Sequence, residues 1–140
     1  MIEFRPLAGS EIDEAVVLWE ACGLTRPPND PVADAKRAID GPRSTIISTF
    51  AGDHLIGTAM TDWDDNCGRI YYLGVEAGFR RWGIGRKLIR TCEDWLTQFN
   101  APKVQLMVFA ENDQTSRFCE AIGYEEETYG IYCRQLRSRS

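Results

Sequence analysis

The stretch 73–86 constrains the fold of this chain more than any other feature. A strand pattern over residues 69–75, rich in Tyr, Ile and Val, leads into a turn that holds Gly83 and Gly85 and opens an amphipathic helix over residues 83–99. A strand, a glycine turn and a helix in this order direct free backbone N–H groups and the positive end of the helix dipole toward one point. The pattern therefore predicts an anion-binding site, suited to a phosphate.

Basic residues gather in the same stretch, although the chain as a whole is acidic. Arg80, Arg81 and Arg86 lie close together, whereas 16 Lys and Arg against 21 Asp and Glu give the 140-residue chain a formal net charge of -5. The overall charge argues against a nucleic-acid binder, and the local reversal supports an anion site. A P-loop is excluded because no G-K-[ST] follows, and a dinucleotide fingerprint is disfavoured because its third glycine is missing.

Periodic patterns predict the remaining elements in the order β-α-α-β-β-β-α-β-α-β, within one domain of residues 1–140. One helix is capped by Ser10 and ended by Gly23, and the next has Asp30 as N-cap and Pro31 at its first position. The last helix has Asn112 as its N-cap and ends at Gly123, which is expected to be a left-handed C-terminal cap. The expected strands cover residues 2–7, 44–50, 55–62, 69–75 and 104–109, with one or two weaker strands in 124–136.

Other site classes are disfavoured by the cysteine pattern and by the absence of long apolar runs. The 5 cysteines are widely spread, with no C-x-x-C pair and a single histidine, His54, which we interpret as structural. We therefore expect neither a metal site nor a disulfide scaffold. No apolar run is long enough for a membrane span or a secretory signal, so we expect a cytoplasmic protein without a membrane partner.

Two segments together resemble the GNAT superfamily of N-acetyltransferases. Arg80-x-x-Gly83-x-Gly85, preceded by Leu73-Gly74-Val75 on a strand, resembles the family's acyl-CoA pyrophosphate loop. The strand 104–109, followed by Glu111-Asn112 and a helix closing in Ala121-Ile122-Gly123-Tyr124, is similar to its second cofactor segment. The order of elements also fits, so the resemblance covers essentially the whole chain. Residues 24–31 further resemble the small bacterial YpeA-type acetyltransferases.

The resemblance implies an α/β (α+β) fold with a central mixed, mostly antiparallel sheet, splayed between its fourth and fifth strands and flanked by helices. It implies acetyl-CoA as co-substrate and no metal. The backbone of Leu73 and Val75 would pair with the pantetheine arm, and Asn112 would touch it, cap its helix, or do both. The implied cofactor-binding residues are Leu73, Gly74, Val75, Arg80, Arg81, Trp82, Gly83, Ile84, Gly85, Arg86 and Asn112.

The chemistry that the resemblance implies is direct attack of a neutral amine on the thioester, with a backbone N–H of the fourth strand steadying the oxyanion. An alkylamine with a pKa of about 10 must first lose a proton. Glu76, at the end of the fourth strand, is the first candidate base. Asp62, Asp64 and Asp65 are alternatives, and one of the two tyrosines at 71 and 72 would face the cleft and orient water or substrate.

Cys119 departs from the family pattern. Family members often carry a tyrosine there as general acid for the leaving thiolate, seven residues after the asparagine, whereas this chain reads Phe118-Cys119. Cys119 is either the general acid, a small apolar substitute or a reactive thiol. The missing tyrosine motivates an alternative function, a non-catalytic acyl-CoA-binding sensor or regulatory module. A third hypothesis, a thiol-based redox protein, rests only on the cysteine count.

The acceptor is expected to be a primary amine of a small molecule or of a protein or peptide, and the acidic composition favours a cationic one. Loop residues and nearby aromatic residues are the candidates for binding it. These are Arg26, Asn29, Asp30, Trp63, Tyr71 and Tyr129. Residues 129–136 could also form a strand edge that pairs two copies into a homodimer.

Overall fold

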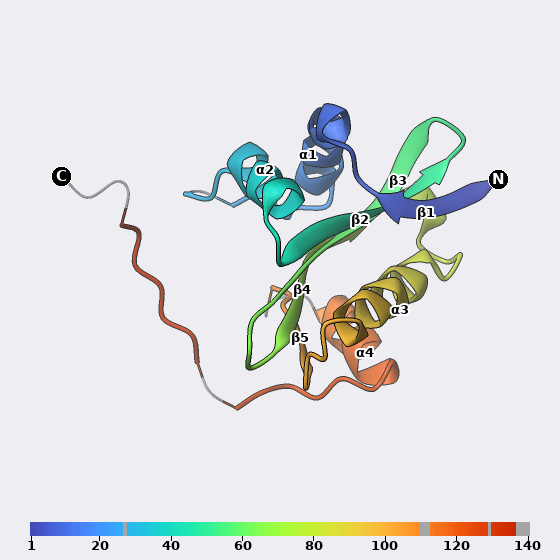
Figure 1. Ribbon diagram of the computed structural model, residues 1–140. Coiled ribbons are helices and arrows are strands. Elements are labelled where there is room, and N and C mark those ends of the chain that lie inside the picture. Colours follow the sequence, from blue (N-terminus) through green and yellow to red (C-terminus); the bar gives the residue numbers. More distant parts are fainter. Residues whose placement is uncertain (27, 110–112, 129, 137–140) are drawn as a thin grey trace.

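The computed structural model describes residues 1–26, 28–109, 113–128 and 130–136. Within them the strands form one mixed sheet, in which β1 to β4 pair antiparallel and β4 pairs parallel with β5 (Figure 1). The strands are β1 (Ile2–Pro6), β2 (Ser44–Ala51), β3 (His54–Trp63), β4 (Gly68–Val75) and β5 (Val104–Leu106). The predicted mixed, mostly antiparallel sheet is confirmed.

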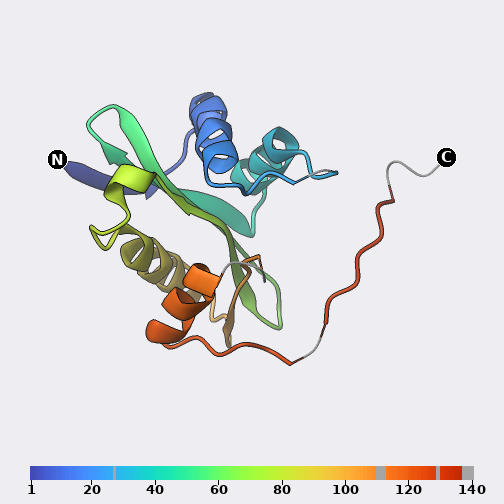
Figure 2. The same cartoon turned by 180° about the vertical axis from the view of Figure 1, so that it is seen from behind.

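Helices cover both faces of this sheet. They are α1 (Ile12–Ala21), α2 (Pro31–Asp40), α3 (Ile84–Thr97) and α4 (Asp113–Ala121), with short 3-10 turns η1 (Gly9–Glu11) and η2 (Ala77–Phe79). Figures 1 and 2 show α1 and α2 on one face and α3 and α4 on the other. One apolar cluster lies under α1 and α2 around Trp19, and a second lies under α3 around Leu88, so burial of both sheet faces holds the layers together.

The helix starts agree only partly with the sequence expectation. Asp30 caps α2 as predicted, because its Oδ1 accepts the Ala33 N–H at 3.2 Å, and Pro31 is the first helical residue. Ser10 as the cap of α1 is wrong. The chain enters α1 through η1 instead, and the Glu11 carboxylate accepts the Ala8 N–H at 2.9 Å, which stabilises this entry in place of a serine cap.

A β-bulge in β4 opens the sheet. Thr58 pairs with Gly74 but Met60 pairs with Tyr71, so Tyr72 and its successor in β4 stand opposite a single residue of β3. Tyr72 has a φ of 49°, which is unusual for a bulky side chain. Beyond the bulge β4 has no strand partner on its far side among the described residues, because β5 pairs only from Gly68 to Ile70. The expected splay is confirmed, and β5 is shorter than the predicted 104–109.

The predicted C-terminal strands are wrong. The described residues from 124 to 136 form neither helix nor strand, and the segment runs away from the body in Figures 1 and 2. Ile131 and Tyr132 are 71% and 98% exposed, so their apolar surface meets nothing that would hold a strand in place. A weak alternation does not specify a strand without a neighbour to pair with. Tyr129 lies outside the described residues.

No helix in the described part of the chain is both long enough and apolar enough to span a bilayer. All five cysteines, each within the described ranges, are free thiols. Among the described residues no three His, Cys, Asp or Glu side chains gather in a group that could hold a metal ion.

Candidate active site

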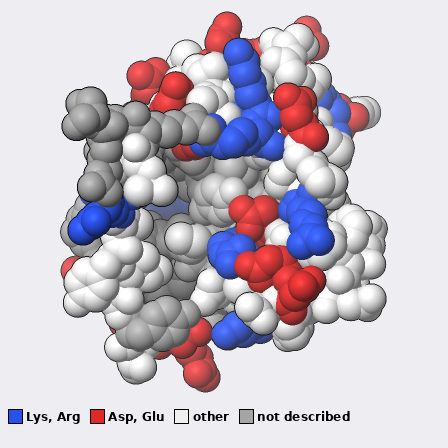
Figure 3. Space-filling model, turned by 60° about the vertical axis from the view of Figure 1, so that its left-hand side comes forward, with Lys and Arg blue, Asp and Glu red and all other residues white. Residues whose placement is uncertain are grey.

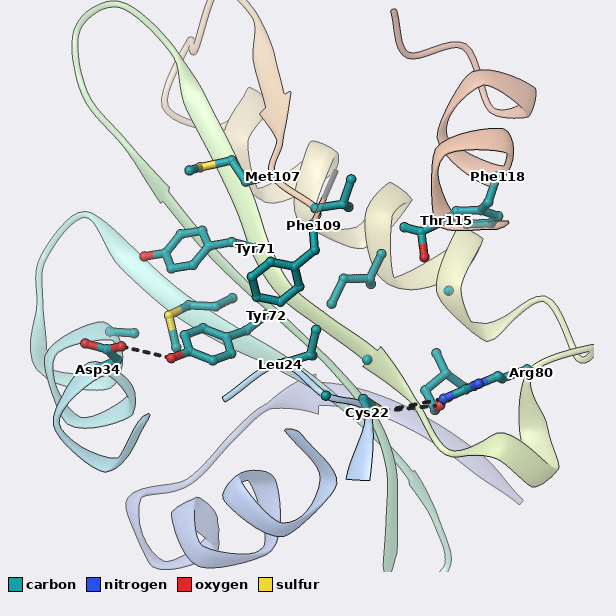
Figure 4. Close-up of a pocket in the computed structure, with 18 of the residues that line it drawn as sticks. Cys22, Leu24, Asp34, Tyr71, Tyr72, Arg80, Met107, Phe109, Thr115 and Phe118 are labelled. Carbon is teal, nitrogen blue, oxygen red and sulfur yellow. Dashed lines mark hydrogen bonds between the residues drawn. The ribbon is translucent and has the colours of Figure 1, made fainter. Parts of the chain in front are cut away.

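A cleft of about 1770 Å³ runs along β4 where the bulge opens the sheet. One end lies against the turn before α3, and the other is walled by α2 and by the segments that follow α1 and β5. Figure 3 shows this face hollowed at its centre, and Figure 4 shows side chains from all of these segments converging on the hollow. The stretch 73–86, which the sequence singled out, and side chains remote from it therefore share one cavity.

The α3 end of the cleft is built from backbone. Gly83 is the N-cap of α3 with a φ of 75°, a left-handed conformation that glycine adopts without strain. The Lys87 N–H donates to the Gly83 carbonyl at 3.2 Å, so the N–H groups of the three residues between them have no helical acceptor. A Cβ on Gly85 would lie 3.5 Å from the Phe118 ring, so nothing in the protein itself requires glycine there. This end therefore has the free backbone N–H groups that an anion site requires.

Arg80 joins the turn to the end of β4. Its Nε donates to the Val75 carbonyl at 3.0 Å, and its terminal nitrogen lies 3.9 Å from the Cys22 Sγ, as the dashed lines of Figure 4 show. Arg81, Arg86 and Trp82 also line the cleft, and Trp82 is 64% exposed with its edge against Phe79. The guanidinium of Arg80 thus fixes the turn, whereas Arg81 and Arg86 place positive charge along the cleft.

The backbone of β4 beyond the bulge faces the gap. The Glu76 N–H donates to the Ile56 carbonyl of β3 at 2.8 Å. Because successive N–H groups of a strand point to opposite sides, the Val75 N–H points away from β3, into the gap that β5 leaves. Cys22 and Leu24 pack closely against Gly74, where a Cβ would lie 3.2 Å from each side chain. β4 therefore offers an extended backbone edge to a ligand.

The other end of the cleft is built from side chains. The bulge turns both Tyr71 and Tyr72 into it, where strict alternation would have admitted one. The Tyr71 hydroxyl donates to Asp62 Oδ2 at 2.6 Å and the Tyr72 hydroxyl to Asp34 Oδ2 at 2.9 Å. Burial, and then these carboxylates, raise the pKa of both phenols, so both remain neutral donors at neutral pH.

A buried network holds the unusual backbone of Tyr72. Trp19 stacks on the Tyr72 ring at 4.3 Å between centroids, and the Trp19 Nε1–H donates to Thr58 Oγ1 at 2.7 Å. The Thr58 hydroxyl in turn donates to the Tyr72 carbonyl at 3.1 Å, and Thr58 is fully buried. Strain at Tyr72 is therefore offset by one ring contact and a chain of two hydrogen bonds.

Arg26 reaches across this end of the cleft. Its guanidinium carbon lies 3.6 Å from the centroid of the Phe109 ring, so the segment after α1 touches the segment after β5. Asn29 and Met107 also line the cleft, and the Asn29 N–H donates to the Arg26 carbonyl at 3.0 Å. The acceptor candidates Arg26, Asn29 and Tyr71 thus all line the cleft.

Most of the predicted cofactor segment lines the cleft as well. These residues are Leu73, Gly74, Val75, Arg80, Arg81, Trp82, Gly83, Gly85 and Arg86. Ile84 does not line it, since its side chain is 3% exposed in the core beneath α3. Asn112 lies outside the described residues.

Several other candidates lie elsewhere. Glu76 is outside the cleft lining, and its carboxylate pairs with the ring of His54 at 2.8 Å, which gives His54 a structural partner. Trp63 packs against Phe99 in the cluster under α3, with 5.0 Å between ring centroids, rather than flanking the cleft. Asp30 is used as the cap of α2.

Cys119 is half-buried on α4 and does not line the cleft, whereas its neighbour Phe118 does. Burial raises the pKa of the Cys119 thiol. The geometry thus brings neither Cys119 nor Glu76 to the residues of the cleft.

Sequence reasoning missed Asp34, Arg37 and Arg43 as cleft residues. In the sequence, Asp34 is an acidic residue in the first turn of a helix, and the helix dipole is a sufficient reason for an acidic residue there. Nothing in the sequence links Asp34 to Tyr72, which lies 38 positions away. Such a pair is visible only when the chain is folded.

Solved structures of two acetyltransferases and of a protein described as a transcriptional regulator share this fold. The aminoglycoside N-acetyltransferase AAC(6')-Iy, solved with the bisubstrate analogue CoA-S-monomethyl-acetylneamine, is 18% identical with a TM-score of 0.80, over 97% of this chain and 99% of that chain. The 6'-N-acetyltransferase AAC(6')-Ih from Acinetobacter baumannii is 16% identical with a TM-score of 0.78, over 97% and 99%. A transcriptional regulator from Bacillus halodurans C-125 is 15% identical with a TM-score of 0.82, over 96% and 100%. At these identities the likeness concerns the fold.

The match to a family is made at the level of sequence. The model of the acetyltransferase (GNAT) family matches residues 12–124, which include the bulged strand, the glycine turn and α3. Acetyl-CoA is the co-substrate of this family, and the anion site at α3 and the open edge of β4 suit its pyrophosphate and its extended arm. This chain belongs to the GNAT acetyltransferase family.

Proposed function

We propose that this protein transfers the acetyl group of acetyl-CoA to a primary amine of a small molecule, with both substrates bound in the cleft at once. The observation that carries the proposal is the two-ended cleft. The N-terminus of α3 and a pair of hydrogen-bonded tyrosines lie at opposite ends of a stretch of β4 that has no strand partner on its far side among the described residues. This arrangement would bring a phosphate-bearing donor and an amine acceptor together beside Val75.

The residues of the α3 end fit coenzyme A. The N–H groups of the first turn, with Arg81 and Arg86 beside them, would hold the pyrophosphate, and the backbone of Leu73 and Val75 would pair with the pantetheine arm. Arg80 would contribute by fixing the turn through its bond to the Val75 carbonyl. Bound acetyl-CoA would supply the thioester, whose C–S bond is exchanged for a C–N bond to the amine.

The chain itself would steady the developing charge and take up the proton. A backbone N–H of β4 that faces the gap is the proposed donor to the thioester oxygen. The amine must lose a proton, and Asp34 and Asp62 are the carboxylates among the described lining residues. We therefore assign proton uptake to these two aspartates, each reached through its tyrosine, in preference to Glu76.

Two further facts support a small-molecule acceptor. The described lining residues of the cleft come from seven separate stretches of the chain, between residues 22 and 118, as in a pocket that surrounds a small ligand. The structural neighbours include AAC(6')-Iy with an acetylneamine-based bisubstrate analogue and an aminoglycoside acetyltransferase with sisomicin.

A calorimetric titration with acetyl-CoA tests the donor assignment, with NADH and ATP as controls. We expect acetyl-CoA to bind with micromolar affinity and the two controls not to bind. Binding of acetyl-CoA should be at least about tenfold weaker when Arg80 is changed to alanine, because the turn loses the hydrogen bond from Arg80 to the Val75 carbonyl. Near-normal binding by Arg80→Ala and by Gly83→Ala would overturn the pyrophosphate-loop assignment.

A non-catalytic acyl-CoA sensor is the second candidate, and the position of Cys119 favours it. A thiol outside the cleft, with a raised pKa, offers no acid to the leaving sulfur. Release of CoA thiol in the presence of a panel of amines separates the two functions. We expect Cys119→Tyr to leave the transfer rate unchanged or raise it in an enzyme, whereas a sensor transfers nothing in either form.

A further inference from the structure

The end of the cleft that holds Tyr71 and Tyr72 has an aromatic and apolar wall. The two tyrosines and Leu24 pack against the apolar cluster under α1 and α2, to which the buried Met60 belongs, and all four side chains line the cleft. The two tyrosine rings are half-buried, with 6.1 Å between their centroids. The core therefore holds two aromatic rings in place while part of their surface faces the cleft.

The segment that follows β5 adds to this wall. The Met107 N–H donates at 2.9 Å to the carbonyl of Ile70, the residue before Tyr71, so the segment starts beside the tyrosines. Met107 and Phe109 both line the cleft, and the guanidinium carbon of Arg26 lies 3.6 Å from the Phe109 ring centroid (Figure 4). Aromatic rings and a thioether favour contact with an apolar or aromatic ligand.

The carboxylates of the cleft already have partners within the protein. Asp34 and Asp62 are the carboxylates among the described lining residues, and each accepts a tyrosine hydroxyl. Asp34 also pairs with Arg37, and Asp62 pairs with Arg69 at 3.2 Å. Neither carboxylate is therefore left to balance an additional ammonium group. A ligand with several ammonium groups would lose their hydration in the cleft without gaining an equal number of partners.

We propose that the acceptor is an arylalkylamine, a single primary amine joined by a short alkyl chain to an aromatic ring that packs against Tyr71, Tyr72 and Phe109. This inference rests on the proposed function and names the class of its acceptor. The amine nitrogen takes the acetyl group, and CoA leaves as the thiol. The proposal narrows the cationic acceptor expected from the overall charge to an amine with one charge. It also separates this protein from its aminoglycoside-acetylating neighbours, because aminoglycosides carry several ammonium groups.

A matched series of amines tests the proposal with the full chain and acetyl-CoA, and CoA thiol release gives kcat/KM. Phenethylamine is compared with cyclohexylethylamine, which has a saturated ring of similar size, and hexylamine with hexamethylenediamine, which adds a second charge. We expect the aromatic ring to raise kcat/KM about fivefold and the second charge to lower it about tenfold. Equal values for the two ring amines, or a diamine that reacts as well as phenethylamine, overturn the proposal.

Phe109→Leu locates the ring preference, and Phe99→Leu is its matched control, since Phe99 follows α3 and lies outside the cleft lining. Phe109→Leu should reduce the preference for phenethylamine over cyclohexylethylamine about twofold, because one of three rings is lost, and leave the dissociation constant of acetyl-CoA unchanged. The preference should persist in Phe99→Leu. An equal change in both variants, or none in Phe109→Leu, contradicts the placement of the ring.

Arg37→Gln tests the argument from the paired carboxylates, with Lys36→Gln as control, an exposed neighbour on α2 outside the cleft lining. The change removes the cation beside Asp34 and makes this carboxylate available to a second ammonium group. The disadvantage of hexamethylenediamine against hexylamine should shrink about threefold in Arg37→Gln and stay the same in Lys36→Gln. An unchanged disadvantage in Arg37→Gln contradicts the argument.

Failure of the acceptor class is distinguishable from failure of the proposed function. If acetyl-CoA does not bind, or binds without thiol release to any amine, the proposed function fails and the acceptor class fails with it. If transfer occurs without a preference for the aromatic monoamine, only the acceptor class fails.

Discussion

The two ends of the cleft are built in different ways. The α3 end comes from one continuous stretch, 73–86, and presents backbone N–H groups, glycines and a helix terminus. The other end, called the acceptor end because we propose that the amine binds there, is assembled from the side chains of residues far apart in sequence: Arg26, Asp34, Tyr72 and Phe109. A backbone site tolerates much change in side chains but little change in chain path, whereas a side-chain site depends on packing elsewhere that holds each rotamer.

The two ends meet in β4. Tyr72 and Val75 lie three positions apart on one strand, so the bulge that opens the acceptor end also turns the Val75 N–H into the gap. The buried residues that hold the bulge, Trp19 and Thr58, touch neither substrate position. The comparison therefore predicts that perturbing these supports affects the acceptor end first.

The largest expected effect is that of Thr58→Val. This change keeps the shape but removes the acceptor of the Trp19 Nε1–H and the donor to the Tyr72 carbonyl, and leaves both groups buried. We expect a loss of about 3 kcal/mol in the free energy of unfolding, measured by urea denaturation. The KM of the acceptor should rise more than the dissociation constant of acetyl-CoA.

Thr49→Val is the control for this prediction. The Thr49 hydroxyl is equally buried but has no hydrogen-bond partner among the described residues. Its removal should change the free energy of unfolding by less than about 0.5 kcal/mol or stabilise the protein. Equal losses in the two variants would mean that the Trp19–Thr58–Tyr72 chain does not hold the bulge.

Gly85→Ala separates folding from cofactor binding at the other end. The added Cβ makes only an ordinary contact with Phe118 at 3.5 Å and alanine favours a helix more than glycine does, so the melting temperature should be equal to or higher than that of the unaltered protein. The methyl group faces the ligand side of the first helical turn, and we expect acetyl-CoA to bind about tenfold more weakly, a loss of about 1.4 kcal/mol by calorimetry.

Gly9→Ala, at a position with nothing near its Cβ and outside the cleft, serves as control for that titration. Unchanged affinity in Gly85→Ala would show that the ligand does not approach the turn closely.

Tyr72→Phe tests the acceptor end with a smaller change. It removes the hydroxyl that donates to Asp34 and keeps the ring stacked on Trp19. We expect a loss of about 1 kcal/mol in stability. Steady-state kinetics should show a changed acceptor KM or kcat with an unchanged dissociation constant for acetyl-CoA, and the reverse pattern would break the division between the two ends.

The smallest effect is expected at Asp64, in the turn between β3 and β4. A hydrogen bond from Arg69, and then the N–H groups of Asn66 and Cys67, lower its pKa to about 2. Because the folded pKa lies below the unfolded one, the ionised carboxylate stabilises the fold above about pH 4, and this contribution disappears as the pH falls toward 2.

Asp64→Asn should therefore lose stability less steeply between pH 4 and pH 2 than the unaltered protein, as followed by thermal unfolding at each pH. The difference should be small because the side chain is exposed. Parallel curves for the two proteins would show that the Arg69 pair does not contribute in solution.

The sequence could predict the α3 end and much of the fold because their signals are local. The cap at Asp30, the helix end at Gly23, the left-handed glycine at 123 and the glycine turn before α3 each depend on neighbouring residues only. The C-terminal strands were wrong because a weak alternation needs a partner strand, which the described residues do not supply there.

By itself, the sequence of this protein predicted an anion site in the stretch 73–86 and determined much of the order of helices and strands around it, since both depend on backbone geometry over short stretches. Only the tertiary structure decided that two adjacent tyrosines share the cleft, that the Glu76 carboxylate pairs with His54 outside the cleft, and that six arginines line one cleft of an acidic chain. The physical reason is that a bulge, a packing partner and a local charge each depend on residues that meet only when distant parts of the chain fold together.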